Sequence, residues 1–365
     1  MNIPCRRCAV VVALNFKVSC PTPVPSRRVH YSQTQHYAFS ATTSCKGPVR
    51  ATAPSPVESS ATFRVTTSMS SSPSLVTPTW LKDRLKDPSI KVLDGSWYMP
   101  AAGRNPREEF KRDRIPGSHF FDVDKISDPD TDLPHMLPTE RAFAAAADAL
   151  GIEKDTQVVV YDRSGVFSAP RVWWTFRAFG HERVTVLDGG YPAWQAEGLP
   201  IDSEPVEDDT VDAAAQAAAS PPASTSYPAK LQEGLVRSMA QVRSNIESGQ
   251  ETVIDARGAG RFAGIEAEPR AGVRSGHIPN SINVPFTQVL AGGKFKDREE
   301  LAKVFADAGV DISAPIVASC GTGVTASVLA LALHHLSPTS QVAIYDGSWT
   351  EWGGSKDTPV VTSKD

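Results

Sequence analysis

The feature that most constrains the fold of this 365-residue chain is the repetition of its own landmarks. Five short landmarks of the first half recur in the second half, in the same order. The paired positions are Asp94 and Asp255, Pro116 and Pro279, Asp162 and Cys320, Asp188 and Asp346, and Trp194 and Trp352. The separation is 158 residues for the last three pairs and 161 to 163 residues for the first two. A nearly constant separation indicates the tandem duplication of one domain.

Each half of the chain alternates short apolar, β-branched runs with helix-forming segments. In the first half we expect strands at 90–94, 157–161 and 184–187, and helices at 80–85, 139–150, 168–179 and 192–197. In the second half we expect strands at 253–255, 281–284, 315–319 and 342–345, and helices at 239–247, 298–308, 326–336 and 350–352. This alternation predicts an α/β fold in which each repeat is a mostly parallel sheet flanked by helices on both faces.

Composition suggests where the two repeats begin and end. We expect the first repeat at 75–200, a linker at 201–233 and the second repeat at 234–356. The linker prediction rests on an acidic stretch followed by a segment that is rich in Ala, Ser and Pro and has little hydrophobic bulk. Residues 213–219 could form one helical turn, but they offer no apolar stripe to bury.

Residues 1–70 have the composition of a transit peptide or a disordered segment. They are basic and rich in Ser, and no acidic residue precedes Glu58. This composition is typical of import into a mitochondrion or, as the alternative, a plastid. The other two interpretations are a secretory signal, for which the apolar run at 9–14 is short, and a disordered cytosolic tail. Composition does not fix the cleavage site.

Charge, hydropathy and cysteine placement exclude several classes of protein. A formal net charge of -4 gives no overall electrostatic basis for binding nucleic acid. No apolar run approaches the roughly 18 residues that a membrane-spanning helix needs. Four of the five cysteines lie before residue 60, and the Cys5–Cys8 pair has no second pair at zinc-site spacing. Once this segment is removed only Cys320 remains, which excludes an intramolecular disulfide and fits a reducing compartment.

Cys320 is the strongest candidate for a reactive residue. It ends an apolar run, and a loop with two glycines separates it from the next helix. A thiol at the C-terminal end of a buried strand faces backbone N–H groups and the positive end of a helix, which favour the thiolate. The alternative is a cysteine that only fills the core. The equivalent residue in the first repeat is Asp162, which cannot perform thiol chemistry. We therefore expect a non-catalytic first repeat that forms one wall of an interdomain cleft.

Several longer motifs are more specific than the cysteine alone. They are Cys320-Gly321-Thr322-Gly323-Val324-Thr325, Gly276-His277-Ile278-Pro279, Phe120-Phe121-Asp122, His135-Met136-Leu137-Pro138 and Ser168-Ala169-Pro170-Arg171-Val172-Trp173-Trp174. With these motifs the chain resembles the two-domain rhodanese family of sulfurtransferases, from about Leu75 to Gly354. The resemblance implies that Cys320 carries sulfur as a persulfide, with no metal and no organic cofactor.

Within that family, the loop after the cysteine separates two donor preferences. Members that prefer thiosulfate resemble Cys-Arg-Lys-Gly-Val-Thr, and members that prefer 3-mercaptopyruvate resemble Cys-Gly-Ser/Thr-Gly-Val-Thr, which is the form found here. An Arg-Lys pair would stabilise the compact thiosulfate dianion, whereas Gly321 and Thr322 carry no charge. The resemblance therefore implies sulfur transfer from 3-mercaptopyruvate with release of pyruvate. Sulfur transfer from thiosulfate to cyanide is the alternative, as a main or a side activity.

The resemblance also implies roles for individual residues. Arg261 and Arg270 match two family arginines that hold the substrate carboxylate, a task for which the planar guanidinium is suited. Asp124, His135 and Thr322 match a relay proposed to assist the reaction, in which many members carry Ser in place of Thr. The N–H groups expected to stabilise the thiolate and then the persulfide belong to Gly321, Thr322, Gly323, Val324 and Thr325. The persulfide then passes its outer sulfur to cyanide, a small thiol or thioredoxin.

Two other classes of function compete with this interpretation. A cysteine-dependent phosphatase needs an arginine six residues after the cysteine, but that position holds Ala326. A non-catalytic binding module would require that the second repeat, like the first, form no persulfide.

Overall fold

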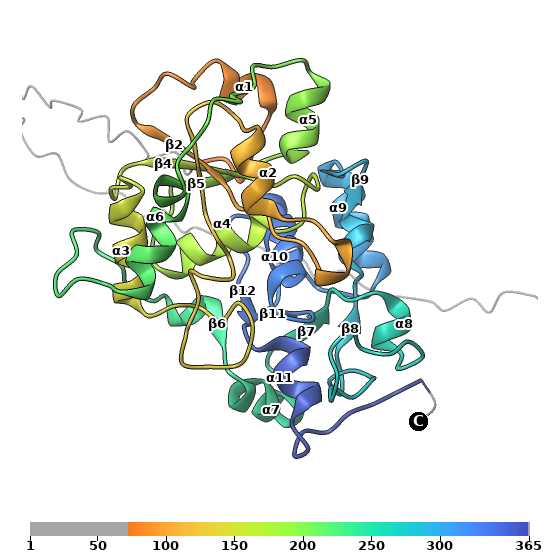
Figure 1. Ribbon diagram of the computed structural model, residues 1–365. Helices are drawn as coiled ribbons and strands as arrows, with labels where there is room; N and C mark the ends of the chain where they lie inside the picture. Colours follow the sequence, from red (N-terminus) through yellow and green to blue (C-terminus); the bar gives the residue numbers. More distant parts are fainter. Residues whose placement is uncertain (1–71, 364–365) are drawn as a thin grey trace, which may run out of the picture. The chain divides into compact units, whose positions relative to one another are not determined.

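Two parallel sheets, one from each repeat, organise the protein (Figure 1). The computed structural model describes residues 72–363, so the transit-peptide prediction for 1–70 lies outside the described residues. The strand order is β1-β5-β4-β2-β3 in the first sheet and β6-β12-β11-β7-β8 in the second. Neighbouring strands in both sheets are parallel. Because the two orders are equivalent, the α/β fold and the tandem duplication are confirmed.

The first repeat contains five strands and its flanking helices. The strands are β1 (Leu75–Val76), β2 (Ile90–Asp94), β3 (Ser118–Phe120), β4 (Gln157–Tyr161) and β5 (Val184–Leu187). The helices are α1 (Pro78–Lys82), α2 (Pro106–Arg112), α3 (Glu140–Ala149), α4 (Ala169–Ala178), α5 (Gly190–Ala196) and α6 (Asp208–Ala219).

The second repeat has the same plan with one addition. Its sheet strands are β6 (Val236–Arg237), β7 (Thr252–Asp255), β8 (Ile282–Asn283), β11 (Ile316–Ser319) and β12 (Val342–Tyr345). Its helices are α7 (Met239–Ser248), α8 (Ala259–Phe262), α9 (Arg298–Asp307), α10 (Val324–Leu336) and α11 (Ser348–Gly354). The addition is an antiparallel hairpin formed by β9 (Leu290–Ala291) and β10 (Lys294–Phe295).

The central strands are buried on both faces because helices cover each side of each sheet. In β4, Val158 and Val160 join one hydrophobic cluster, whereas Val159 joins another on the opposite face. In β11, Val317 is separated from its two neighbours in the same way. Helices α1 and α5 cover the outer face of the first sheet, and α7 and α11 cover the outer face of the second (Figure 1).

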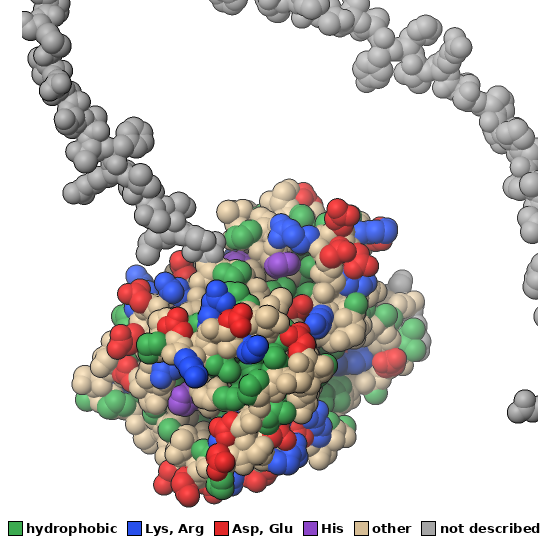
Figure 2. All heavy atoms as spheres, turned by 90° about the horizontal axis from the view of Figure 1, so that it is seen from above, with side chains coloured by type: hydrophobic (Ala, Val, Ile, Leu, Met, Phe, Trp, Pro, Cys, Tyr) green, Lys and Arg blue, Asp and Glu red, His purple; other side chains and the backbone are tan. Residues whose placement is uncertain are grey.

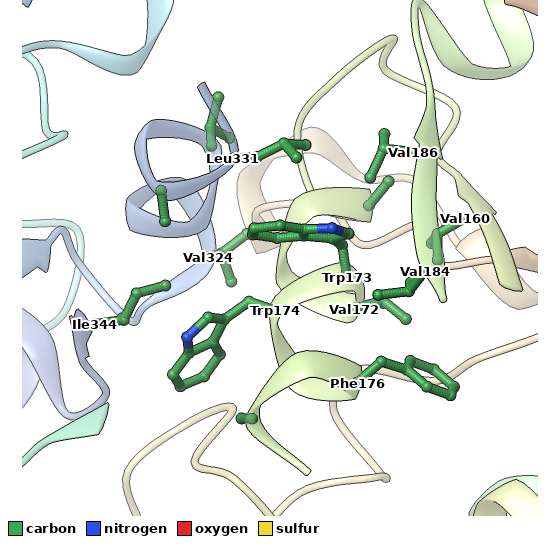
Figure 3. Packing of buried hydrophobic residues seen from close by; sticks show 14 of the residues in the cluster. Val160, Val172, Trp173, Trp174, Phe176, Val184, Val186, Val324, Leu331 and Ile344 are labelled. Atoms are coloured by element: carbon green, nitrogen blue, oxygen red, sulfur yellow. The ribbon is translucent and has the colours of Figure 1, made fainter. Parts of the chain in front are cut away.

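Helices α4 and α10 pack against each other between the sheets and join the two repeats (Figure 3). Trp173 of α4 extends toward α10, where Val324 and Leu331 lie beside it (Figure 3). Its indole ring also meets His334 of α10, with ring centroids 5.3 Å apart. A buried tryptophan removes on the order of 200 Å² from water, which stabilises the folded state by about 5 kcal/mol. The shared core therefore holds α10, and the loop that precedes it, firmly against the first repeat.

The segment 201–233 contains a helix that the sequence analysis did not expect. Helix α6 packs along α3 and buries Val211, Ala214, Ala215 and Ala218, which follow helical spacing. The prediction that this stretch has no apolar stripe to bury is wrong. Its stripe consists mostly of methyl groups, and the buried face of α3 is also rich in Ala, so the two helices can approach closely. The acidic start of α6 is held by Arg107 of α2.

The outer surface carries charges of both signs. On the face shown in Figure 2, basic and acidic side chains are interspersed over the surface. Among residues 72–363, no helix combines the length and the apolar content that crossing a bilayer requires.

Candidate active site

Cys320 lies at the C-terminal edge of the second sheet, directly after the central strand β11. Strands β7 and β12 flank β11 on its two sides. The cysteine side chain is only 2% exposed, and Cys320 is the free cysteine among the described residues. Loops at the C-terminal edge of a parallel sheet are where α/β proteins place their ligands. The fold therefore puts the candidate nucleophile where substrates of such folds bind.

The backbone around Cys320 is held by the start of α11. The Cys320 N–H donates to Ser348 Oγ at 3.2 Å, and the Trp349 N–H donates to the Cys320 carbonyl at 2.9 Å. The Gly321 carbonyl accepts from both the N–H and the hydroxyl of Thr350, at 2.9 and 2.7 Å. Four hydrogen bonds from one short segment thus fix the backbone of the candidate nucleophile and of the residue that follows it.

Gly323 closes the cysteine loop and starts α10. Its φ of 78° lies in the left-handed region, and a Cβ at this position would lie 2.5 Å from Nη1 of Arg171. The left-handed φ favours glycine, and a Cβ here would also force the buried Arg171 guanidinium to move. No side chain caps the start of α10, whose first N–H groups have no partner within the helix. These N–H groups and the helix dipole make the start of α10 a suitable place for an anion.

The first repeat contains such an anion at the equivalent place. Asp162 follows β4 as Cys320 follows β11, and it is 1% exposed. Its Oδ1 accepts the Ser164 N–H at 2.8 Å. Its Oδ2 accepts the N–H groups of Phe167, Ser168 and Ala169 at 2.8, 3.0 and 2.9 Å. A strand, a loop and a helix start in this arrangement can therefore hold a buried negative charge with backbone N–H groups alone.

The two predicted substrate arginines, one on α8 and one in the loop that follows it, differ in their contacts. Arg261 of α8 reaches the cysteine loop, because its Nη2 lies 3.4 Å from where a Gly321 Cβ would be. Its guanidinium is paired with Glu268, with Nε 3.2 Å from Oε1 and Nη2 in contact with Oε2. Arg270 is half-buried, and within the described part of the chain it makes no ion pair. The structure thus brings Arg261 to the loop, whereas no contact ties Arg270 to it.

Arg257 is buried between two carboxylates. Its guanidinium contacts Asp255 at 2.6 Å and Glu268 at 2.7 Å, and it lies 4.3 Å from the ring of Trp349. Burial opposes its charge, but the Asp255 and Glu268 carboxylates more than offset this and raise the pKa of Arg257. Arg257 therefore organises the wall of the site, and it leaves Arg261 as the more accessible cation.

The predicted relay is formed in part. His135 Nε2 lies 2.9 Å from Asp124 Oδ1, and Trp97 Nε1 donates to the other carboxylate oxygen at 3.1 Å. His135 is 4% exposed, has a left-handed φ of 64°, and leaves its Nδ1 buried without a partner. Thr322 is also buried, but no hydrogen bond joins it to His135 in the described structure. The Asp124–His135 pair is present, and its link to the cysteine loop is absent.

Four site residues were not identified from the sequence: Ser348, Thr350, Arg171 and Asp346. The first two lie 28 and 30 positions after Cys320, and nothing in the motifs indicates that they would hold its backbone. Asp346 was noted only as a repeated landmark, although its recurrence at the end of a strand in both repeats could have marked it. Within residues 72–363, no cluster of three or more His, Cys, Asp or Glu could hold a metal ion.

Known proteins resemble this chain over both repeats. A family model described as the rhodanese-like domain matches residues 77–197 and 238–355. The chain is 44% identical over 363 residues to thiosulfate/3-mercaptopyruvate sulfurtransferase 1, mitochondrial, of Arabidopsis thaliana, which covers 96% of this chain and 94% of that protein. It is 42% identical over 285 residues to the 3-mercaptopyruvate sulfurtransferase of Rattus norvegicus, covering 76% and 91%. The crystal structure of the 3-mercaptopyruvate sulfotransferase SseA from Escherichia coli matches with a TM-score of 0.65 at 36% identity, covering 76% of this chain and 99% of SseA.

Proposed function

Because this chain belongs to the rhodanese family, with two rhodanese-like domains, we propose that it transfers sulfur from 3-mercaptopyruvate to a thiophilic acceptor. The observation that carries the proposal is a cradle of backbone N–H groups between a central strand and the helix that follows it. In the first repeat this cradle holds the Asp162 carboxylate with four N–H groups, and in the second repeat a cysteine takes that position. A cradle that can hold an anion suits a sulfur that acts as a nucleophile and then carries a persulfide.

The proposed reaction has two steps. In the first, the Cys320 thiolate attacks the sulfur of 3-mercaptopyruvate; an S–S bond forms and the bond from sulfur to carbon breaks. The electron pair of the broken bond leaves as the enolate of pyruvate, which takes up one proton. In the second step an acceptor thiolate or cyanide attacks the outer sulfur and regenerates the Cys320 thiolate. This is covalent catalysis by a double displacement.

The choice of donor follows from where the positive charge lies. The cysteine loop itself carries no cationic side chain at Gly321 or Thr322. Beside Gly321 the neighbouring charge belongs to Arg261, which comes from α8 outside the loop. A donor whose carboxylate is separated from its sulfur by two carbon atoms can reach such a cation, whereas thiosulfate carries its charge on the sulfur group itself. Thiosulfate is the second candidate donor, because the Arabidopsis thaliana relative is named for both substrates.

The first test compares the two donors. We expect kcat/KM for 3-mercaptopyruvate to exceed that for thiosulfate by at least about tenfold, which corresponds to 1.4 kcal/mol of transition-state binding. Mass spectrometry of the Cys320 peptide should show the addition of one sulfur atom after exposure to donor alone. A higher kcat/KM for thiosulfate would support the thiosulfate:cyanide alternative, and no added sulfur with either donor would support a non-catalytic module.

Arg261 should be needed for donor binding through its carboxylate. Replacing Arg261 by Met is expected to lower kcat/KM for 3-mercaptopyruvate by about 10- to 100-fold, because a hydrogen bond to a charged group contributes about 1.5–3 kcal/mol. Arg270→Met should lower it as well if both arginines hold the carboxylate. Steady-state kinetics with varied donor is the measurement.

The control for these variants is Lys303→Met, which removes a cation from the exposed face of α9. It should leave kcat/KM unchanged. If Arg261→Met and Lys303→Met lower kcat/KM equally, the rate depends on the net charge of the protein. A specific contact between Arg261 and the donor carboxylate is then contradicted. Because Arg261 is paired with Glu268, we also expect Arg261→Met to leave Glu268 held by Arg257 alone.

The cellular setting and the acceptor complete the proposal. Import into a mitochondrion is supported by the basic, Ser-rich residues 1–70 and by the mitochondrial relative, with a plastid as the alternative. Imaging a fluorescent protein fused behind residues 1–70 distinguishes the two organelles. The proposed acceptors are cyanide, a small thiol and thioredoxin, which can be ranked by their rates with persulfidated protein.

A further inference from the structure

Arg171 belongs to the first repeat but lies against the cysteine loop of the second. It is on α4, and its side chain is 2% exposed. Its Nη1 lies 2.7 Å from Oδ1 of Asp346, the residue that follows β12. The same nitrogen is the atom that a Cβ at Gly323 would approach to 2.5 Å. The guanidinium therefore packs directly against the residue at which the cysteine loop becomes α10.

The second terminal nitrogen of Arg171 contacts the other side of the site. Nη2 donates a hydrogen bond to the carbonyl of His135, whose ring is paired with Asp124. The face of the guanidinium lies 4.6 Å from the ring of Trp174. One side chain thus contacts the His135 segment and the cysteine loop at the same time, and aromatic packing limits its movement.

Asp346 extends this connection to the backbone of the nucleophile. Its Oδ2 accepts the N–H of Leu137 at 2.8 Å. Two residues later in the chain begins the segment Ser348–Thr350, whose hydrogen bonds hold the backbone of Cys320 and Gly321. A displacement of Arg171 would therefore reach Cys320 through Asp346 as well as through Gly323.

The ion pair between Arg171 and Asp346 is unusual for a contact that only stabilises the fold. Nη1 and Oδ1 lie 2.7 Å apart as an ion pair, and neither atom has a hydrogen-bond partner in the described structure. Removing two charges from water in this way is costly, and apolar side chains of similar size often stabilise such a place better. A buried pair of this kind is weak evidence for stability and calls for another role.

The duplication provides an internal comparison. Asp188 is the counterpart of Asp346, and it accepts the N–H of Phe295 at 2.9 Å across the interface. Phe295 is in turn the counterpart of Leu137, because both pairs are separated by 158 residues. The backbone contact therefore exists twice. Among residues 72–363, however, no arginine pairs with Asp188, and the position 158 residues after Arg171 holds Leu329. The arginine is present only on the side that has the cysteine.

We propose that Arg171 is a positioning residue for sulfur transfer. Through it, the first repeat holds the cysteine loop (321–323) and the segment 135–137 in the arrangement that sulfur transfer requires. It acts through Gly323, Asp346 and the His135 carbonyl, and it has no contact with Arg261. Its loss should therefore slow the chemical step more than it weakens donor binding, because a misplacement of about 1 Å can cost 100-fold in rate. The proposal rests on the proposed function, since turnover is its readout.

The test uses the full chain and three variants. Arg171→Lys keeps the charge but loses the planar fork, and Asp346→Asn keeps an oxygen for Leu137 but removes the ion pair. Asp188→Asn is the matched control, because it alters the equivalent interface contact on the side without the cysteine. Persulfide formation by the unchanged protein is measured first, so that a failure of the proposed function is recognised before any variant is compared. For each variant we then measure kcat and KM for 3-mercaptopyruvate, the rate of Cys320 alkylation by iodoacetamide, and the unfolding temperature.

We expect Arg171→Lys and Asp346→Asn to lower kcat at least about tenfold while KM changes less than about threefold. Alkylation of Cys320 should slow in the same two variants. Asp188→Asn should keep kcat within about twofold, even if its unfolding temperature falls as far as that of the other two variants. If all three variants lose kcat equally, or if none does, Arg171 serves only to hold the two repeats together. If Arg171→Lys does not fold, Asp346→Asn decides the question.

Discussion

Replacing Cys320 by serine is expected to abolish sulfur transfer from either donor, with a loss of at least about a thousandfold in kcat. The serine hydroxyl cannot form a persulfide, so the covalent intermediate is lost. Among the described residues, no second cysteine is present that could take over from Cys320. The measurement is pyruvate release from 3-mercaptopyruvate, together with the mass of the residue-320 peptide, which should gain no sulfur.

The structure indicates that this substitution leaves the fold intact. Serine is smaller than cysteine and fits the same buried position, and the hydrogen bonds of Cys320 to Ser348 and Trp349 use only backbone atoms of residue 320. The unfolding transition of the variant should therefore stay close to that of the unchanged protein. Pyruvate release that persists in a correctly folded Cys320→Ser protein would refute the assignment of the nucleophile.

Replacing Asp162 by alanine should damage stability and spare chemistry. Four N–H groups lose their acceptor, and those of Ser168 and Ala169 are fully buried, so we expect the free energy of unfolding to fall by about 3–5 kcal/mol. The free energy of unfolding of Asp162→Asn should lie between those of the unchanged protein and Asp162→Ala. The amide oxygen can still accept from Phe167, Ser168 and Ala169, whereas the NH₂ group faces the Ser164 N–H. Chemical denaturation followed by tryptophan fluorescence measures these differences.

The control for Asp162 is Asp311, a loop carboxylate that accepts one N–H, from Ser313. Asp311→Ala should change stability little because that site is exposed. At temperatures where Asp162→Ala remains folded, kcat for 3-mercaptopyruvate should stay near the unchanged value. A large loss of kcat without a loss of stability would mean that the first repeat takes part in the chemistry through Asp162, contrary to the assignment made here.

The main features of the fold, and the place of the candidate nucleophile at the end of a central strand, were predictable because they depend on local sequence. The β-branched runs around Val159 and Val317 are short, apolar and alternate with helices, so the parallel sheets follow. The duplication needed only the order and separation of short landmarks. Cys320 was identifiable because strand, cysteine, glycine loop and helix are contiguous in the chain, and their geometry is set by the loop itself.

The remainder depends on contacts between distant segments, which a single sequence does not reveal. Helix α6 was missed because its buried face is made of alanines, whose hydrophobic signal is weak until the alanine face of α3 is opposite. Ser348 and Thr350 hold the Cys320 loop from a different helix. The gap between His135 and Thr322 was likewise invisible, because each residue fits its motif and only the fold decides whether they meet.

The contacts across the interface between the two repeats are reciprocal. Asp188 binds the N–H of Phe295, and Asp346 binds the N–H of Leu137, which is the same contact made in both directions. Two identical subunits related by a two-fold axis make contacts of this isologous kind. The interface between the two repeats therefore has the approximate two-fold symmetry that an isologous dimer interface has. One repeat carries the thiol at Cys320, and the other carries Asp162 at the equivalent position together with Arg171, whose guanidinium reaches across to the cysteine loop of its twin.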